Sequence, residues 1–228
     1  MKCRTLSIIH TIFLSSALNF LGFASIPDQQ DQLSEILERL EKNYNKAETV
    51  SCSFEQRKKI RQLTEIMSLS GKLYFKKPHF LRMEFRGDEN FDFYTNGMKV
   101  WLVDFDFDEV ESFEFKKLDS DKRISRLLPP VFFKTTEEMK EIFNFFLRTD
   151  RGKTQRIEII PIRSSDVPFE SLKFDVDSLG RITWMKVHYN KEEYTEMNFR
   201  NWKRHPEISD YYFQYRKSEK RNAHSDIS

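Results

Sequence analysis

The spacing of apolar residues changes along this chain of 228 residues. Between residues 28 and 49 apolar side chains recur every three or four positions, and charged residues fill the gaps between them. This pattern is typical of an amphipathic helix with one buried stripe. The stripe consists of Leu33, Ile36, Leu37, Leu40 and Tyr44. We therefore expect a helix at the start of the folded domain.

From residue 50 onward the apolar period falls to two, the period of a β-strand with one buried face. Asn96-Gly97 predicts a tight hairpin turn, because both residues tolerate a positive φ. The first expected strands carry the apolar faces Val50-Cys52-Phe54, Leu73-Phe75, Leu81-Met83-Phe85 and Phe91-Phe93, followed by Val100–Val103 and Phe105–Phe115. The later ones are Arg156–Pro161, Phe169–Val176, Arg181–Tyr189, Glu193–Phe199 and Tyr211–Tyr215. We expect about eleven strands in all.

The alternation stops between about residues 120 and 148, where Pro129-Pro130 interrupts the chain. Thr135 or Thr136 is a candidate N-cap, with Glu137 and Glu138 in the first helical turn. The residues with helical spacing are Met139, Ile142, Phe143, Phe146 and Leu147. We expect two short helical pieces inserted into a β chain.

Short strands joined by turns predict a sandwich or a barrel. The chain has 22 Phe, 8 Tyr and 3 Trp but only 6 Gly, so the fold must accommodate many bulky apolar side chains. A closed barrel of about eleven strands has more interior than a compact core fills. Two interpretations stay open, a packed core and an apolar cavity that holds a ligand.

The first two dozen residues have the layout of a secretory signal peptide. Lys2 and Arg4 form a basic start, and residues 6–23 contain no Asp, Glu, Lys or Arg. Gly22 and Ala24 supply the small residues that a cut after Ala24 needs. We expect residues 1–24 to be removed on export, with an uncleaved anchor as the alternative. The rest forms one domain, residues 25–217, and a polar, disordered tail, residues 218–228.

Charge and cysteine content narrow the classes of partner and of site. Removing Lys2 and Arg4 from the 38 Lys and Arg leaves 36, equal to the 36 Asp and Glu, so net charge gives no argument for nucleic acid. Cys3 leaves with the signal, and Cys52 then has no disulfide partner. No Cys lies at the cleavage point, so we expect no lipid anchor on the mature protein.

No arrangement of residues indicates catalysis or a metal site. The histidines are scattered, and the chain has no G-x-S-x-G, Walker or G-x-G-x-x-G motif. Residues 104–108 resemble the start of a calcium loop, but Glu109 stands where the tight turn needs Gly. We expect these carboxylates to share a solvated strand face, opposite Phe105 and Phe107. Cys52 is better explained as a packed thiol than as a nucleophile. We therefore expect neither an enzyme nor a cofactor.

A series of short motifs, in order over most of the chain, resembles the LolA family of periplasmic outer-membrane lipoprotein carriers. Each motif is weak, and their order and spacing carry the resemblance. The matching segments are Ser53-Phe54-Glu55-Gln56 for S-F-x-Q, Gly71–Pro78 for G-x-L-x-(V/L)-K-R-P, Leu81-Arg82-Met83 for F-x-W or F-R-W, Asn96–Trp101 for D-G-x-x-(L/V)-W, and Leu172–Val176 with Gly180–Ile182 for a later strand–turn–strand.

The resemblance implies an incomplete antiparallel half-barrel with a helical lid over an apolar cavity. It implies a monomeric carrier that takes lipoprotein acyl chains from an inner-membrane complex of the ABC type to an outer-membrane receptor. We expect the acyl-binding cavity to be lined by Phe54, Leu73, Phe75, Leu81, Met83, Phe85 and Trp101. We expect the lid to include Leu33, Leu37, Leu127, Leu128 and Phe132.

Lys77 stands where the family has the Arg before Pro that is thought to latch the lid through hydrogen bonds. Lys keeps the charge of Arg but not its planar fork of donors. Lys77 is therefore a latch candidate, and a solvated Lys at a strand end is the alternative. Two other functions also stay open: a periplasmic lipid-binding or lipid-sensing module on the same fold, and an interaction protein with a filled core.

Overall fold

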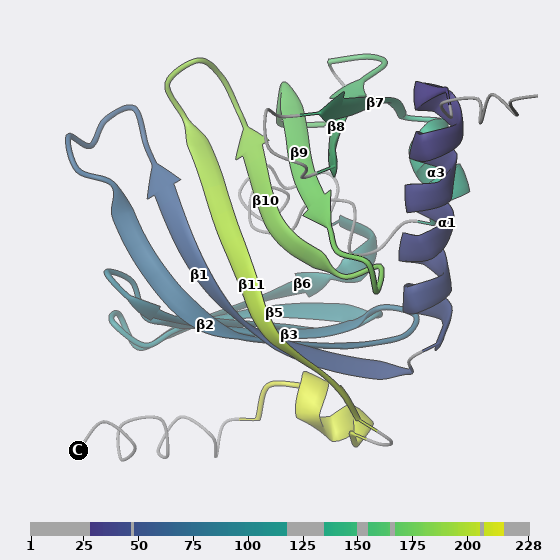
Figure 1. The fold of residues 1–228 in the computed structure, drawn as a ribbon. Coiled ribbons are helices and arrows are strands. Elements are labelled where there is room, and N and C mark those ends of the chain that lie inside the picture. Colours follow the sequence, from purple (N-terminus) through teal and green to yellow (C-terminus); the bar gives the residue numbers. More distant parts are fainter. Residues whose placement is uncertain are drawn as a thin grey trace, which may run out of the picture.

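The computed structural model describes residues 28–46, 48–117, 135–149, 155–164, 167–205 and 208–216. Within these ranges eleven strands form one antiparallel sheet, which curves into an open half-barrel (Figure 1). The elements are α1 Gln29–Lys46, β1 Thr49–Lys59, β2 Met67–Lys76, β3 Phe80–Gly87, β4 Phe91–Asn96, β5 Lys99–Asp104, β6 Glu109–Glu114, η1 Phe115–Lys117, α3 Thr136–Lys140, β7 Phe143–Thr149, β8 Gln155–Pro161, β9 Ser171–Val176, β10 Ile182–His188, β11 Tyr194–His205 and η3 Asp210–Phe213.

The strand order is β6-β5-β4-β3-β2-β1-β11-β10-β9-β8-β7. The sheet does not close, because β6 and β7, which follow one another along the chain, lie at its two opposite edges. The predicted incomplete half-barrel of about eleven antiparallel strands is thus confirmed.

The predicted N-terminal helix is confirmed as α1, which stands at one side of the half-barrel and contacts β7 (Figure 1). Its apolar stripe buries Leu33, Ile36 and Leu37 against the sheet. The turn between β9 and β10 packs on the C-terminal half of α1 at Gly180, which has a φ of 75°. A Cβ at this position would collide with the Arg39 carbonyl oxygen, so only Gly permits this close approach.

Cross-strand pairing builds the core on the concave face of the sheet. Side chains directly opposite one another in adjacent strands share a face. One such row joins Phe54, Gly71, Phe85 and Phe91 across β1 to β4. The ring centroids of Phe54 and Phe85 are 5.1 Å apart, and those of Phe85 and Phe91 are 4.3 Å apart.

The convex face of β3 and β4 is covered by the C-terminal segment, where η3 forms instead of the predicted strand Tyr211–Tyr215. Phe213 is fully buried there, with its ring 5.6 Å from that of Phe80. The Arg82 guanidinium lies between the rings of Tyr94 and Tyr212, 4.8 Å and 4.4 Å from their centroids. An apolar and aromatic surface thus covers the outer side of these strands.

Two further sequence expectations were wrong. Phe143 to Leu147 belong to strand β7, and the helix before it, α3, ends at Lys140. Of the two predicted N-cap candidates, Thr135 caps this helix. The Glu138 amide donates to Thr135 Oγ1 and the Thr135 amide donates to the Glu138 carboxylate, which together form a capping box.

Residues 105–108 form the turn between β5 and β6 rather than a strand, and Phe107 is 77 % exposed. The Asp104 carboxylate accepts hydrogen bonds from the amides of Asp106 and Phe107, which fixes this turn. Among the described residues, no helix has the length and apolar character that crossing a bilayer would require.

Candidate binding site

The residues predicted to line a cavity come together on the concave face, with one exception. Pairing places Leu73 opposite Met83 and Phe75 opposite Leu81, beside the row that contains Phe54 and Phe85. All six side chains are buried, with exposed fractions of 6 % or less. They form an apolar surface across β1, β2 and β3 and belong to the same hydrophobic core as the buried stripe of α1.

Trp101 is the exception, because it lies on the convex face of the sheet. It pairs with Tyr94, which belongs to the cluster under η3, whereas Val100 pairs with Thr95 on the concave side. Side chains alternate along a strand, so Val100 and Leu102 face the core and Trp101 does not. The Asn96-Gly97 turn sets this register, since it fixes which residue of β5 meets Thr95.

The concave face also continues over the second half of the sheet, which the sequence analysis left out of the site. The same two-residue period is present there in the sequence, so the signal was available. The buried apolar residues of β8 to β11 are Ile157, Ile159, Leu172, Phe174, Met185, Val187, Met197 and Phe199. The apolar surface therefore spans both sides of the central β1–β11 pair.

Two of the predicted lid residues, Leu33 and Leu37, are buried on α1 against this core. The other three, Leu127, Leu128 and Phe132, lie outside the described residues. Helix α1 thus lies over the β7 side of the concave face.

Lys77 lies in the turn between β2 and β3, next to a cis peptide bond to Pro78. Its amide donates to the carbonyl oxygen of Glu48, in the connection between α1 and β1. Burial lowers the pKa of the Lys77 ammonium from its ordinary value, and the nearby Glu48 carboxylate opposes this shift. Lys77 is therefore tied to the base of the helix that covers the concave face.

Cys52 lies within the same apolar surface and is 3 % exposed. Burial raises the pKa of its thiol well above the ordinary value, which keeps the thiol protonated and unreactive. Within the part of the chain that the structure describes, no group of three or more His, Cys, Asp or Glu side chains is arranged to hold a metal ion.

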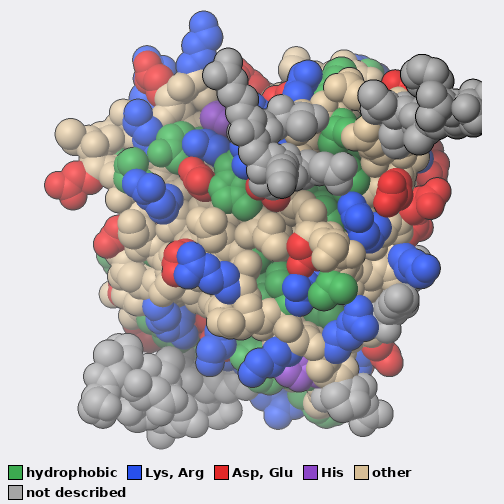
Figure 2. Space-filling model, viewed as in Figure 1, with side chains coloured by type: hydrophobic (Ala, Val, Ile, Leu, Met, Phe, Trp, Pro, Cys, Tyr) green, Lys and Arg blue, Asp and Glu red, His purple; other side chains and the backbone are tan. Residues whose placement is uncertain are grey.

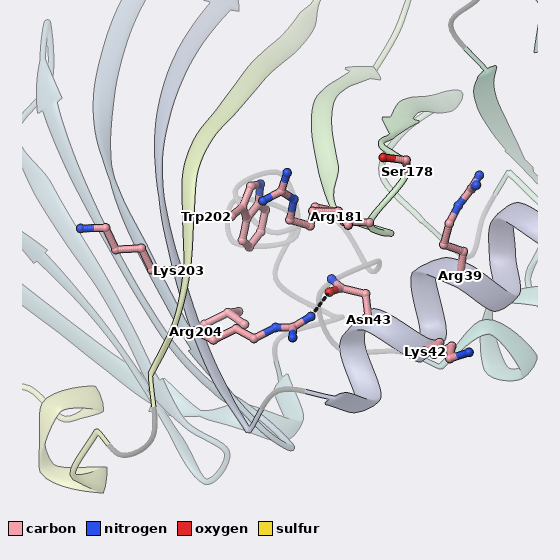
Figure 3. Close-up of a pocket in the computed structure, with 10 residues that line it drawn as sticks. Arg39, Lys42, Asn43, Ser178, Arg181, Trp202, Lys203 and Arg204 are labelled. Atoms are coloured by element: carbon pink, nitrogen blue, oxygen red, sulfur yellow. Dashed lines mark hydrogen bonds between the residues drawn. The ribbon is translucent and has the colours of Figure 1, made fainter.

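A pocket of about 580 Å³ opens between the C-terminal half of α1, the β9–β10 turn and β11 (Figure 3). Its floor is apolar, formed by Val50 and Trp202, which pack against the core. Its rim is cationic, and its lining includes Arg39, Lys42, Arg181, Lys203 and Arg204. Figure 2 shows Lys and Arg side chains spread over the lower part of this side of the molecule, beside hydrophobic ones.

Comparison with known proteins agrees with this architecture. Residues 45–216 match the family model described as outer membrane lipoprotein carrier protein LolA. The outer-membrane lipoprotein carrier protein of Francisella tularensis is 22 % identical over 186 residues, which are 82 % of this chain and 84 % of the relative.

Solved structures of low sequence identity also align with the chain. A DUF1329 family protein of Desulfovibrio piger aligns with a TM-score of 0.49 and 12 % identity over 83 % of this chain and 98 % of its own. Lipoprotein LppX of Mycobacterium tuberculosis aligns with a TM-score of 0.48 and 12 % identity over 78 % of this chain and 98 % of its own. A LolA superfamily protein of Nitrosomonas europaea aligns with a TM-score of 0.44 and 9 % identity over 80 % of this chain and 97 % of its own. Because the family model matches well over half of the chain, the protein belongs to the LolA family.

Proposed function

We propose that this protein is an exported carrier that holds the acyl chains of lipoproteins against the concave face of its sheet. The observation that carries the proposal is the large, mainly apolar surface of that face, which α1 covers at one side. Each CH₂ group moved from water to such a surface contributes about 0.8 kcal/mol, so an anchor with long acyl chains gains strongly from it. Family membership supports lipoproteins as the class of cargo.

The open sheet offers a physical route for loading. The residues of the concave face pack on one another in this state, so acyl chains must displace α1 and move the two halves of the sheet apart. The edge strands β6 and β7 are not paired with each other, so the half-barrel can widen without breaking a hydrogen bond between strands. The closed state then competes with cargo, and this competition lets a carrier release what it holds.

The partners follow from the same proposal. The carrier takes its cargo in the periplasm from an inner-membrane complex of the ABC type and passes it to an outer-membrane receptor. It works as a monomer, without catalysis, cofactor or nucleic acid.

Displacement of the neutral fluorescent probe N-phenyl-1-naphthylamine by a triacylated lipopeptide tests the proposal. Leu81 is completely buried on the concave face, and Leu81→Glu places a carboxylate among apolar side chains at a cost of several kcal/mol. Leu81→Gln is a milder variant that keeps a similar size. We expect both variants, if folded by circular dichroism, to bind lipopeptide more weakly than the wild type.

The control is Val103→Gln, at a residue that is buried to a similar degree but lies under the convex face. It should lose stability and keep lipopeptide binding. Undiminished binding by the folded Leu81 variants would contradict a site at Leu81, and a wild type that binds no lipopeptide would contradict the proposed function itself.

A second candidate function is a lipid-binding or lipid-sensing module that has no lipoprotein cargo. The observation in its favour is the cationic rim of the pocket beside α1, which suits a charged headgroup. Native mass spectrometry of protein purified from periplasm separates the two functions, since a lipoprotein and a phospholipid differ in mass.

A further inference from the structure

The pocket between α1, the β9–β10 turn and β11, here called the basic pocket, differs chemically from the concave face. Of the ten described residues that line it, five are cationic and none carries a carboxylate. The concave face supplies hydrophobic contact alone, whereas this pocket can also recognise charge.

Within the described residues, two of the five cations have an acidic partner and three have none. Arg181 forms an ion pair of 2.7 Å with Asp177, and Arg39 has Glu35 at 3.9 Å. Among the described residues, no carboxylate lies within salt-bridge distance of the other three cations, Lys42, Lys203 and Arg204. The pocket therefore carries a local excess of positive charge although the whole chain is close to neutral.

Arg204 is the central cation of the basic pocket. It extends from β11 across to α1, where its Nη2 donates to Asn43 Oδ1 at 2.8 Å (Figure 3). Lys42 and Lys203 lie at the rim and point away from this centre (Figure 3). A cation near the end of a helix can be explained by the helix dipole, which accounts for Lys42 but not for Arg204 on a strand.

The guanidinium of Arg204 is suited to a phosphate group. It carries five N–H donors in a plane, and within the described part of the chain it makes one side-chain hydrogen bond, to the uncharged amide of Asn43. Two parallel N–H donors match two oxygens of a phosphate, which a neutral amide oxygen cannot offer. A phosphate that displaces Asn43 would replace an uncharged acceptor of the guanidinium with an anionic one.

The surroundings of Arg204 indicate an amphiphilic ligand. Trp202 and Val50 form an apolar floor that joins the core, and Trp202 is held by a bond of 3.0 Å from its Nε1 to the Ile182 carbonyl oxygen. Leu179, at the tip of the neighbouring turn, is 59 % exposed. A ligand bound here can place a charged group on Arg204 while an apolar part leads toward the concave face.

We propose that the basic pocket binds the phosphate group of an anionic glycerophospholipid, with Arg204 as the main ligand. The inference rests on the proposed function in one respect, because the acyl chains of such a lipid enter the same concave face. The shared chemistry is a phosphate ester, and its sources are a lipid headgroup and a free soluble phosphate. The pocket volume of about 580 Å³ favours the lipid, since it exceeds what a lone phosphate fills.

Titration calorimetry with short-chain lipids tests the pocket apart from the concave face. The ligands are dihexanoyl phosphatidylglycerol, dihexanoyl phosphatidylcholine and inorganic phosphate. We expect the anionic lipid to bind more tightly than the other two, and to bind more weakly as salt is added. Arg204→Gln keeps a donor for Asn43 but removes the positive charge. We expect this variant to bind the anionic lipid about tenfold or more weakly than the wild type does.

The matched control is Arg200→Gln, on the same strand but exposed on the convex face, where Arg200 pairs with Glu55. It should bind all three ligands as the wild type does. Equal binding of phosphatidylglycerol by the wild type and Arg204→Gln would overturn the proposal. Inorganic phosphate that binds as tightly as the anionic lipid would overturn the assignment to a lipid.

The two proposals fail in different ways. If the concave face does not hold acyl chains, the neutral probe is not displaced by lipopeptide in any variant. If the basic pocket does not recognise phosphate, Arg204→Gln leaves the preference for the anionic lipid unchanged, whatever the lipopeptide does.

Discussion

At residue 71 the concave face has no room for a side chain. A Cβ there would collide with the backbone oxygen of Glu84 on the neighbouring strand, and it would lie 2.7 Å from the Phe54 ring. The Phe54 ring takes the space that a side chain would use, next to Phe85. The Gly at this position therefore permits the close contact of β2 with β3 beneath an aromatic pair.

Gly71→Ala should destabilise the protein by roughly 3 kcal/mol, the upper part of the range for overpacking a core, because a backbone atom cannot move aside. Urea unfolding followed by circular dichroism measures the loss. Ser70→Ala, at an exposed position on the same strand, should stay within about 0.5 kcal/mol of the wild type. Equal stabilities of the two variants would show that β2 and β3 separate easily.

For single residues, the sequence predicted most of the apolar side chains that face the concave side of the sheet, but it did not assign every side chain to the correct face. The two-residue period identified Phe54, Leu73 and Leu81 because one-sided burial leaves a clear alternation. Trp101 was placed in the cavity on the resemblance, whereas its pairing with Tyr94 puts it on the convex face. The basic pocket was missed because its cations come from segments far apart in the chain.

At the scale of elements, the run from Phe143 to Leu147 shows why short apolar segments are ambiguous. Its apolar residues fit a helical spacing together with Met139 and Ile142, and they also fit a strand with Phe143 and Leu147 inward. Pairing with β8 decides the outcome, since β7 adds a strand to an existing sheet. A non-local partner of this kind is invisible to the local period.

The η3 segment should contribute strongly to stability although it lies near the chain end. Phe213 is fully buried against Phe80, so Phe213→Ala should cost about 3–5 kcal/mol. The control on the same element is Tyr211→Ala, because Tyr211 is 63 % exposed. Thermal unfolding of both variants measures the difference. A Phe213→Ala protein as stable as the control would mean that η3 detaches readily from β3 and β4.

The side chain of Lys77, a residue whose backbone is bonded to the base of α1, should govern how tightly the helix covers the concave face. If the Lys77 ammonium latches the lid, Lys77→Leu opens the unloaded state and slows the release of acyl cargo. One charged hydrogen bond corresponds to about 10- to 150-fold in that balance. Lys77→Arg should preserve or strengthen closure, because Arg adds donors.

Stopped-flow off-rates of a fluorescent acyl ligand measure this effect for the wild type and the two Lys77 variants. The same off-rate for all three proteins would show that Lys77 is a charged residue of the β2–β3 turn and has no part in the release of acyl cargo. Both variants should keep the hydrogen bond from the residue 77 amide to the Glu48 carbonyl oxygen, because this bond is made by the backbone.

At the scale of the whole molecule, export is the first expectation. The basic start, the uncharged stretch to Phe23 and the small residues Gly22 and Ala24 predict cleavage after Ala24. N-terminal sequencing of the protein from a periplasmic fraction should then begin at Ser25. Recovery of the chain in membranes with Met1 intact would contradict this expectation.

The general shape of the fold could be predicted because a regular alternation over most of the chain leaves few architectures. The resemblance supplied the open edge and the covering helix, and neither follows from the period alone. The position of η3 on the convex face could not be predicted, since Tyr211 to Tyr215 carry β-forming side chains in a segment whose packing partners are β3 and β4.

The pairing of β1 with β11 has a consequence for the order of folding. Strands β1 to β6 form one series in which each strand pairs with the next along the chain, and β7 to β11 form a second such series. Strands β6 and β7 are consecutive in the chain but lie at opposite edges of the sheet. The two meanders can therefore begin from local hairpins, but joining them brings Thr49 to His205 and requires closure of a loop that spans most of the domain. The sheet cannot be completed until the chain has been delivered as far as β11. If the chain is exported from its N-terminus, we therefore expect the first half of the sheet to stay without its β11 partner until the C-terminal half has crossed the membrane.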